Sequence, residues 1–338
     1  MDWFEQLTGF REGHYADTQA RLSVENQRLN STVNGRSYSI GRLDVLSLGE
    51  LRARANLVAE RGRLSVRNVS ADVRSLHRAH QHRGALFQVA SQFNLLEMVG
   101  PTITPEHGVT RYSSDRTQGP ACAIAAGAAT IYRNYFVPIA GHLGQTADRQ
   151  IDAAAELRQA LASALGVSAD DVWSMRNGYA LPKVDGLQRV RNYLGSVDEA
   201  TREELKNRLR IGLHSDVEVT DGGSPEQIVS QAFCSAMPVS YSGFEPNAWE
   251  PLARLVLEAA YEATLAAAAL TAQRSQTPLV FLTRLGGGAF GNDDAWIDAA
   301  IRMALGRFRD YALEAVFVSY GPVPPSLRAL EGEFPPST

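Results

Sequence analysis

Apolar runs of strand length alternate with amphipathic stretches of helical length over most of the chain. A first clear strand is predicted over Ala85–Asn94. The runs Pro278–Thr283 and Leu313–Tyr320 are apolar on both faces, which predicts strands of a sheet that is covered on both sides. Further strands are predicted at Ser37–Leu43, Val172–Tyr179, Ile211–Thr220 and Ile228–Ser240. Because strands alternate with helices, the pattern predicts an α/β fold.

Helices are predicted where apolar positions recur at helical spacing. They are expected at Leu46–Arg61, Val69–Ala79, Ala121–Tyr135, Asp148–Leu165, Pro182–Leu194, Ser196–Leu209, Trp249–Arg274 and Asp293–Arg307. Ser47 and Glu50 form a capping-box pattern at the start of the first of these. The most apolar stretch, Leu252–Ala272, contains three charged residues about one turn apart. That spacing predicts a core helix with one solvated stripe, and not a membrane span.

The composition is that of an ordinary globular protein. The chain has 338 residues, of which 44% are hydrophobic, enough for one large domain or two small ones. The net charge of −4 does not favour binding to nucleic acid or to an anionic membrane. Cys122 and Cys234 belong to no zinc pattern and predict buried free thiols in a reducing compartment.

The N-terminal residues lack a basic start followed by an apolar run, so no secretory signal is expected. We therefore expect a cytoplasmic protein, with secretion as an effector by a signal-independent route left open.

A glycine-rich loop, GGGAFGN at Gly286–Asn292, lies between a predicted strand and a predicted helix. Glycines let a ligand approach the main chain, and the free N–H groups at the start of the next helix would point back toward the loop. Together they predict a pyrophosphate cradle; the alternative is a tight turn that needs positive φ. Asp293 and Asp294 are expected to cap the helix and to point away from the loop. The spacing matches neither a P-loop nor a Rossmann fingerprint.

The same segment resembles the second ligand loop of the macrodomain superfamily, and most closely that of poly(ADP-ribose) glycohydrolases. Gly288–Gly291 (GAFG) and the pair Tyr320-Gly321 stand where that pattern requires them. The resemblance implies a first ligand loop after an earlier strand that ends in asparagine. Asn94 fits this position and is expected to contact the distal ribose.

The loop after Asn94 departs from the glycohydrolase pattern, because it lacks both the GGG run and the catalytic Gln-Glu-Glu element. It is similar instead to the macro-like family of the Legionella effector MavL and its relatives. The shared stretches are ASQFNLLE, the DxTQGP loop (DRTQGP here), RNYF and GGGAFGN. That family is linked to removal of ADP-ribose from arginine. The resemblance covers residues 38 to 321, and GGGAFGN and DRTQGPACA are its most specific parts.

The resemblance implies a macrodomain-like fold with a mixed central sheet covered by helices on both faces and an N-terminal helical extension. Residues 1–36 are expected to form that extension, residues 37–322 the ADP-ribose-binding domain and residues 323–338 a C-terminal tail.

Three carboxylates are candidate catalytic residues. Asp115 lies in the loop that should face the ribose, where it would orient water or stabilise a cationic transition state; the alternative is a turn-stabilising cap. Glu97 has apolar neighbours, which raise the pKa of a carboxyl group and suit a general acid; the alternative is a structural carboxylate. Asp216 shares a strand face with Glu218, where two carboxylates would flank a scissile bond; the alternative is a solvated face.

The expected ligand contacts come from three segments. Gln118 and Gly119 would present an amide and an N–H, and the alternative for Gln118 is a hydrogen bond at the helix start. Phe290 would pack on the distal ribose or the pyrophosphate, against simple core packing, and Tyr320 would stack on adenine. The expected ADP-ribose-binding residues are Asn94, Gln118, Gly119, Gly286, Gly287, Gly288, Ala289, Phe290, Gly291, Asn292 and Tyr320.

These inferences predict an ADP-ribosyl hydrolase that cleaves the glycosidic bond of mono-ADP-ribosylated protein, on arginine by the resemblance, without a cofactor or metal. The expected partner is ADP-ribose or an ADP-ribosylated protein, and the oligomeric state stays open. The missing Gln-Glu-Glu element leaves a non-catalytic ADP-ribose reader as the alternative. A third reading is a degenerate fold used for protein contacts, against which the intact glycines of the loop count.

Overall fold

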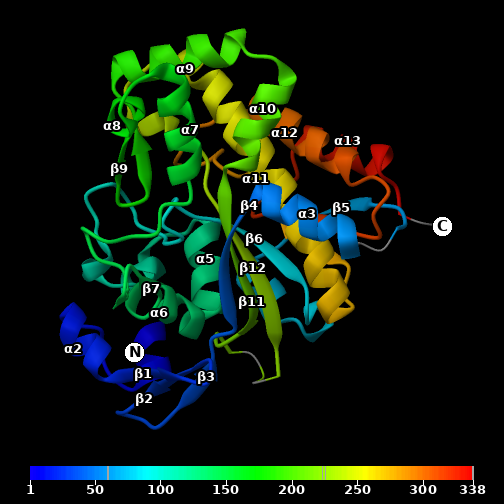
Figure 1. Ribbon diagram of the computed structural model, residues 1–338. Coiled ribbons are helices and arrows are strands. Elements are labelled where there is room, and N and C mark those ends of the chain that lie inside the picture. Colours follow the sequence, from blue (N-terminus) through cyan, green and yellow to red (C-terminus); the bar gives the residue numbers. More distant parts are fainter. Residues whose placement is uncertain (59–60, 223, 225, 337–338) are drawn as a thin grey trace.

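A computed structural model of the protein describes residues 1–58, 61–222, 224 and 226–336. At its centre is a seven-stranded sheet in the order β4-β11-β12-β6-β13-β14-β5 (Figure 1). Its strands are β4 (Arg42–Ser47), β5 (Ser65–Ser70), β6 (Leu86–Ala90), β11 (Arg210–Glu218), β12 (Ile228–Cys234), β13 (Leu279–Leu282) and β14 (Glu314–Ser319). The strands from β12 to β5 run parallel, whereas β11 is antiparallel to both β12 and β4. The sheet is therefore mixed, as predicted.

Helices cover both faces of this sheet, which confirms the predicted fold class. On one face Phe87 stacks on His77, with ring centroids 3.7 Å apart, and on the other Gln88 donates a hydrogen bond to Thr264 (2.9 Å). The first face carries α4 (Val73–Arg78), α5 (Gln118–Ala125) and α6 (Gly127–Tyr135). The second carries α11 (Pro246–Ser275), with α3 (Leu48–Val58), α9 (Val184–Ser196), α10 (Glu199–Asn207) and α12 (Asp294–Arg307) packed on it.

The middle of α11 does not present the solvated stripe that the sequence predicts. The helix is apolar and long enough to cross a membrane, but 89% of its most apolar window is buried inside the protein. Glu262 accepts hydrogen bonds from Arg52 of α3 (2.6 Å) and Arg307 of α12 (3.2 Å). Glu258 lies 3.4 Å from the Nζ atom of Lys206 in α10. The expectation is wrong because basic residues from three neighbouring helices pair with these carboxylates and let them be buried.

The N-terminal residues pack against α6 and belong to a second hydrophobic cluster, which they share with residues of α5, of α6 and of the loop after β6. Trp3, Phe4, Leu7 and Phe10 are all buried in it. The elements here are α1 (Trp3–Thr8), α2 (Tyr15–Ala20) and a three-stranded sheet of β1 (Leu22–Glu25), β2 (Arg28–Ser31) and β3 (Ser37–Ser39). This small sheet lies apart from the central one (Figure 1).

One predicted strand, Ser37–Leu43, is divided between the two sheets. The break falls at Gly41, whose φ is +65° and where a Cβ atom would lie 2.0 Å from the carbonyl oxygen of Ser215. Because glycine alone adopts this conformation without strain and fits this space, the chain turns here from β3 into β4.

Other differences come from short elements. The strand β5 was not predicted, and the helix expected at Val69–Ala79 begins only at Val73, where Asp72 accepts a hydrogen bond from the amide of Arg74. The single strand expected at Val172–Tyr179 is a hairpin of β9 (Ser174–Arg176) and β10 (Tyr179–Leu181). Its turn is Asn177-Gly178, a pair that favours positive φ in tight hairpins.

Several predicted boundaries agree with the structure. The amide of Ser47 donates to the Glu50 carboxylate (2.8 Å), and the Glu50 amide donates to the Ser47 hydroxyl (3.2 Å), so the capping box is confirmed. The helix α7 (Ala155–Leu165) ends at Gly166 in the left-handed conformation. Other short elements include α8 (Ala169–Val172), β7 (Pro138–Ile139) and β8 (His142–Leu143).

The C-terminal segment contains α13 (Pro325–Glu333), which packs against β5 through buried residues such as Leu327 and Leu330. The predicted helix Leu46–Arg61 and the predicted tail 323–338 also include residues 59, 60, 337 and 338, which lie outside the described residues.

Candidate functional site

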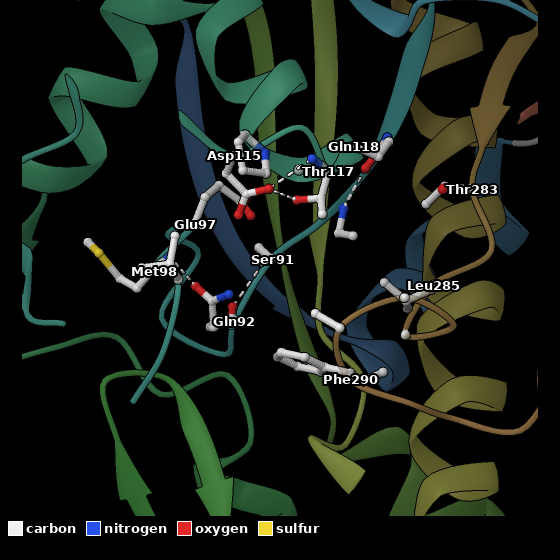
Figure 2. A pocket seen from close by; sticks show the side chains of 18 of the residues that line it. Ser91, Gln92, Glu97, Met98, Asp115, Thr117, Gln118, Thr283, Leu285 and Phe290 are labelled. Carbon is white, nitrogen blue, oxygen red and sulfur yellow. Dashed lines mark hydrogen bonds between the residues drawn. The ribbon is translucent and has the colours of Figure 1, made fainter. Parts of the chain in front are cut away.

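A cavity of about 380 Å³ lies at the carboxyl ends of the parallel strands (Figure 2). Its lining includes Ala90 at the end of β6, Thr283 just after β13 and Tyr320 just after β14. Loops that leave the carboxyl ends of neighbouring strands meet at one edge of an α/β sheet, where such folds bind ligands. Of the residues expected from the sequence, this cavity is lined by Glu97, Asp115, Gln118, Gly119, Gly286, Gly288, Ala289, Phe290 and Tyr320.

Glu97 is the most deeply buried carboxylate of the cavity wall, with 3% of the residue exposed. Its backbone amide donates a hydrogen bond to the Tyr112 hydroxyl (3.0 Å), while its Oε1 atom has no hydrogen-bond partner among the described residues. Burial raises the pKa of Glu97 well above its usual range; the buried Arg133 guanidinium opposes this effect and Asp115 adds to it. A protonated carboxyl group in a cavity is a candidate proton donor.

The start of α5 lies directly against Glu97. A Cβ atom on Gly119 would come within 2.3 Å of the Glu97 Oε2 atom and 2.0 Å of the Ala90 carbonyl oxygen, so only glycine fits here. The Thr117 side chain does not cap this helix. The amides of Gln118 and Gly119 donate to no backbone carbonyl of the described residues, and both residues line the cavity.

Gln118 is used differently from the expectation. Its side-chain nitrogen donates to the Gln88 carbonyl (2.7 Å), and its oxygen accepts from the Ala90 amide (3.0 Å). The side chain thus binds the end of β6, where it holds the helix start in place.

Asp115 lies on the same wall as Glu97 (Figure 2). One oxygen of its carboxylate accepts hydrogen bonds from the amide (2.8 Å) and the hydroxyl (2.7 Å) of Thr117. This is the turn-stabilising role that the sequence left as the alternative, and it fixes the carboxylate at the cavity surface. No group of three or more His, Cys, Asp and Glu side chains suited to a metal ion occurs in the described ranges.

The glycine loop forms the opposite wall, where Leu285 and Phe290 face the carboxylates across the cavity (Figure 2). Gly291 has φ +67°, and a Cβ atom there would lie 1.9 Å from the Ser240 hydroxyl. The buried Asn292 closes the loop, since its side chain donates to the carbonyls of Met237 (2.8 Å) and Gly286 (3.2 Å). Gly291 and Asn292 therefore shape the loop without lining the cavity, and Gly287 does not line it either.

Successive amides of this loop are free to bind an anion. Those of Gly288, Ala289 and Phe290 donate to no backbone carbonyl of the described residues. The first turn of α12 is less available than expected, because the Asp293 carboxylate accepts from the Ala295 amide (2.8 Å). Asp293 therefore caps the helix, as predicted. The loop itself, and not the helix terminus, offers the anion-binding groups.

Aromatic side chains line the cavity beside the loop. The Phe290 ring lies 5.4 Å from that of Tyr179 and 5.7 Å from that of Tyr241, measured between centroids. Tyr320 is 88% exposed at the cavity rim. Tyr241 was not expected in the site. The sequence analysis extended the preceding strand to Ser240, whereas β12 ends at Cys234, and the loop that follows it brings Tyr241 to the cavity.

Asn94 does not reach the cavity, contrary to the expectation. Its side chain is fully buried, donates to the Gln150 oxygen (2.9 Å) and accepts from the Leu96 amide (3.1 Å). Leu95 beside it has φ +63°. Asn94 thus stabilises the tight turn that brings Glu97 to the cavity.

Asp216 also lies away from the cavity. It lies within a β-bulge of β11, between His214 and Val217, has φ +58° and pairs with Arg274 at 3.0 Å. Because β11 is antiparallel to β12, its last residues lie at the amino ends of the parallel strands, on the edge opposite the cavity. The bulge also separates Asp216, which is exposed, from Glu218, which is buried and accepts from the Ser39 amide (2.7 Å). The expected pair of carboxylates on one strand face does not form.

No protein-family model matches the chain, and no curated protein matches its sequence. Solved structures of similar shape include poly(ADP-ribose) glycohydrolase from Deinococcus radiodurans in complex with ADP-ribose, at 14% identity, 87% coverage of this chain, 94% coverage of that chain and a TM-score of 0.46. The glycohydrolase from Thermomonospora curvata is 12% identical, with 93% and 94% coverage and a TM-score of 0.43. The same enzyme bound to the inhibitor ADP-HPD is 13% identical, with 92% and 94% coverage and a TM-score of 0.44.

Proposed function

We propose that the protein binds ADP-ribose in this cavity and hydrolyses the glycosidic bond that joins ADP-ribose to a protein, with arginine as the acceptor. The observation that carries the proposal is the cavity itself, in which Glu97 and Asp115 share one wall and the glycine loop forms the other. The GAFG and Tyr-Gly motifs support the ligand. The arginine acceptor is supported by the sequence resemblance to the MavL-like family.

The ligand's pyrophosphate would lie on the glycine loop. Three successive amides there, those of Gly288, Ala289 and Phe290, donate to no described carbonyl, and a concave set of backbone N–H groups binds anions. Tyr320 at the rim offers its exposed ring to the adenine. The distal ribose would then lie between Phe290 and the start of α5, next to both carboxylates.

The proposed hydrolysis assigns one task to each carboxylate. Water adds to the anomeric carbon of the distal ribose, and the bond from that carbon to the acceptor nitrogen breaks. Glu97 donates a proton to the leaving nitrogen, because its raised pKa favours the protonated acid. Asp115 accepts the proton of the attacking water and stabilises the positive charge that develops on the sugar. Asp216 has no part in this scheme.

The test is release of free ADP-ribose from a mono-ADP-ribosylated arginine substrate, together with calorimetric titration of ADP-ribose. We expect Asp115→Asn to lower turnover by roughly 10²- to 10⁴-fold while ADP-ribose still binds. Asp216→Asn is the matched control, since it makes the same chemical change on the opposite edge of the sheet, and it should keep full activity. Full activity of Asp115→Asn would show that Asp115 has no part in the mechanism. If the wild-type protein does not bind ADP-ribose, the proposed ligand is wrong.

A non-catalytic reader of ADP-ribose is the second candidate. The observation that favours it is the pair of hydrogen bonds from Thr117 to one oxygen of Asp115, which gives that carboxylate a structural task. Binding of ADP-ribose by the wild-type protein without release from arginine, serine or acidic acceptors would favour the reader.

A further inference from the structure

The loop that carries Asp115 is held by a residue from the far N-terminal part of the chain. The carboxylate of Glu12, in the segment between α1 and α2, accepts hydrogen bonds from the amides of Val109 (2.8 Å) and Thr110 (2.7 Å). These two amides lie at the start of a short 3-10 helix, η3 (Thr110–Ser114). Because a 3-10 helix leaves its first amides without internal partners, one carboxylate satisfies both of them.

Two further contacts fix the Glu12 side chain. The Tyr135 hydroxyl of α6 donates to its Oε1 atom (2.8 Å). Burial, and next to it the Glu12 charge, raises the pKa of the Tyr135 phenol, so this phenol remains the donor. Gly108 has φ +77°, and a Cβ atom there would lie 2.4 Å from the Glu12 carboxyl carbon. Glycine is thus required for the loop to close over the carboxylate.

The same 3-10 helix is hydrogen-bonded to the backbone amides of both acidic residues of the cavity. Tyr112 within it is buried, and its hydroxyl accepts the hydrogen bond from the Glu97 amide (3.0 Å). Its carbonyl accepts from the amide of Asp115 (3.2 Å), the residue that directly follows the 3-10 helix. One short helix therefore sets the backbone position of both groups, and Glu12 holds the start of that helix.

We propose that Glu12 is a positioning residue that fixes η3, and through it places Glu97 and Asp115 at the cavity. Glu12 touches neither carboxylate and acts only through the loop. The glycine loop belongs to another part of the sheet edge and does not depend on Glu12. The expected effect of Glu12 on turnover rests on the proposed function, whereas its role in anchoring the loop does not.

The experiment compares Glu12→Gln with the wild type in three measurements. Hydrogen exchange should become at least about tenfold faster in residues 108–115, because the amide group of glutamine offers one acceptor where the carboxylate offers two. Turnover on the arginine-linked substrate should fall by about 10- to 100-fold, since small displacements of catalytic groups have effects of this size. The dissociation constant for ADP-ribose should change by less than about threefold, because the glycine loop is unaffected.

Glu5→Gln is the matched control. Glu5 lies seven positions earlier, in α1, and its carboxylate pairs with Arg11 at 3.5 Å and does not bond the loop. It should leave all three measurements unchanged. Glu12→Asp keeps the charge but withdraws it by one methylene group, and it provides the same test if Glu12→Gln does not fold.

The outcomes separate this inference from the proposed function. Faster exchange in residues 108–115 together with lower turnover and retained binding supports the inference. Unchanged exchange in that segment overturns it, and so does an equal loss of binding and turnover. If the wild-type protein releases no ADP-ribose, the proposed function fails, while the exchange measurement still decides whether Glu12 anchors the loop.

Discussion

Glu97 and Glu262 are equally buried, but they differ in whether their carboxylate oxygens have hydrogen-bond partners. Each is 3% exposed. Glu262, in the interior of α11, accepts hydrogen bonds from Arg52 and Arg307. Glu97, at the cavity, has one oxygen with no partner in the described part of the chain, and its pKa is raised. The difference shows that burial alone does not assign a role to a carboxylate, because a bound guanidinium makes it structural and an unpaired oxygen leaves it available for chemistry.

Glu203 shares Arg52 and Arg307 with Glu262, and these partners affect its pKa as well. Burial raises the pKa of Glu203, but hydrogen bonds from Arg307, Lys206 and Arg52 outweigh it and lower that pKa to about 2. These partners thus keep the Glu203 carboxylate ionised. In the cavity, by contrast, the protonated form of Glu97 is favoured.

The largest effect that we expect is on turnover in Glu97→Gln. The amide keeps the shape of the side chain but cannot donate the acidic proton, so release of ADP-ribose should fall by roughly 10²- to 10⁴-fold with ADP-ribose affinity retained. In the wild type, turnover should decline as the pH rises through the raised pKa, and the pH profile shows this directly. Equal activity of Glu97→Gln and wild type would contradict the proposal that Glu97, unlike Glu262, takes part in the chemistry.

The same residue predicts a pH dependence of stability. The pKa of Glu97 is higher in the folded than in the unfolded state. Its contribution to the free energy of unfolding is therefore fully present below the unfolded pKa and is lost as the pH rises through the folded pKa. Denaturant unfolding at several pH values should show this decline in the wild type and a flatter profile in Glu97→Gln.

The next effect concerns stability in Glu262→Gln. Removing the negative charge takes from the half-buried Arg52 guanidinium the carboxylate that accepts from both its Nε and Nη2 atoms, and leaves it with Glu203, so the free energy of unfolding should fall by about 3 kcal/mol. ADP-ribose binding and turnover should stay at wild-type values, measured on the folded protein. A loss of turnover that exceeds the loss of folded protein would connect the two regions and contradict the comparison.

The smallest effect is expected from Gly291→Ala in the opposite wall. The added Cβ atom would meet the Ser240 hydroxyl at 1.9 Å in a left-handed backbone conformation. Distortion of the loop should weaken ADP-ribose binding by about 10-fold, roughly 1.4 kcal/mol, with little change in turnover at saturating substrate. Gly306→Ala, where a Cβ atom meets nothing within 4 Å, is the control. A fall in turnover without a fall in affinity would indicate that the glycine loop contributes to the chemical step and not only to binding.

Local patterns predicted the parts of the molecule whose contacts are close in sequence. The glycine loop between a buried strand and a capped helix, the Ser47–Glu50 capping box and the helix end at Gly166 all depend on neighbours within a few residues. Their residue types are favoured by the local backbone itself, so the sequence shows them directly.

The remaining features depend on distant residues. Strand β5 was missed because it pairs with β14, and the register joins Val66 to Ala315. The burial of Glu262 depends on Arg52, 210 positions away. Asp216 does not lie on the expected strand face, because β11 contains a bulge that no local sequence pattern predicts. Whether Glu97 is structural or available for chemistry was open in the sequence, because its environment is built by Tyr112, Gly119 and Arg133 from other segments.

The order of the central sheet also affects how the molecule can be assembled during synthesis. β6 pairs with β13, and β14 with β5, so each joins residues synthesised near opposite ends of the chain. Pairings of such long sequence separation form slowly and late. The glycine loop and Tyr320 are translated after most of the sheet. A nascent chain that contains β5, β6 and β12 therefore has unpaired strand edges until β13 and β14 emerge. Such edges are sites of aggregation, so chaperone dependence is expected to be greatest in the last stage of translation.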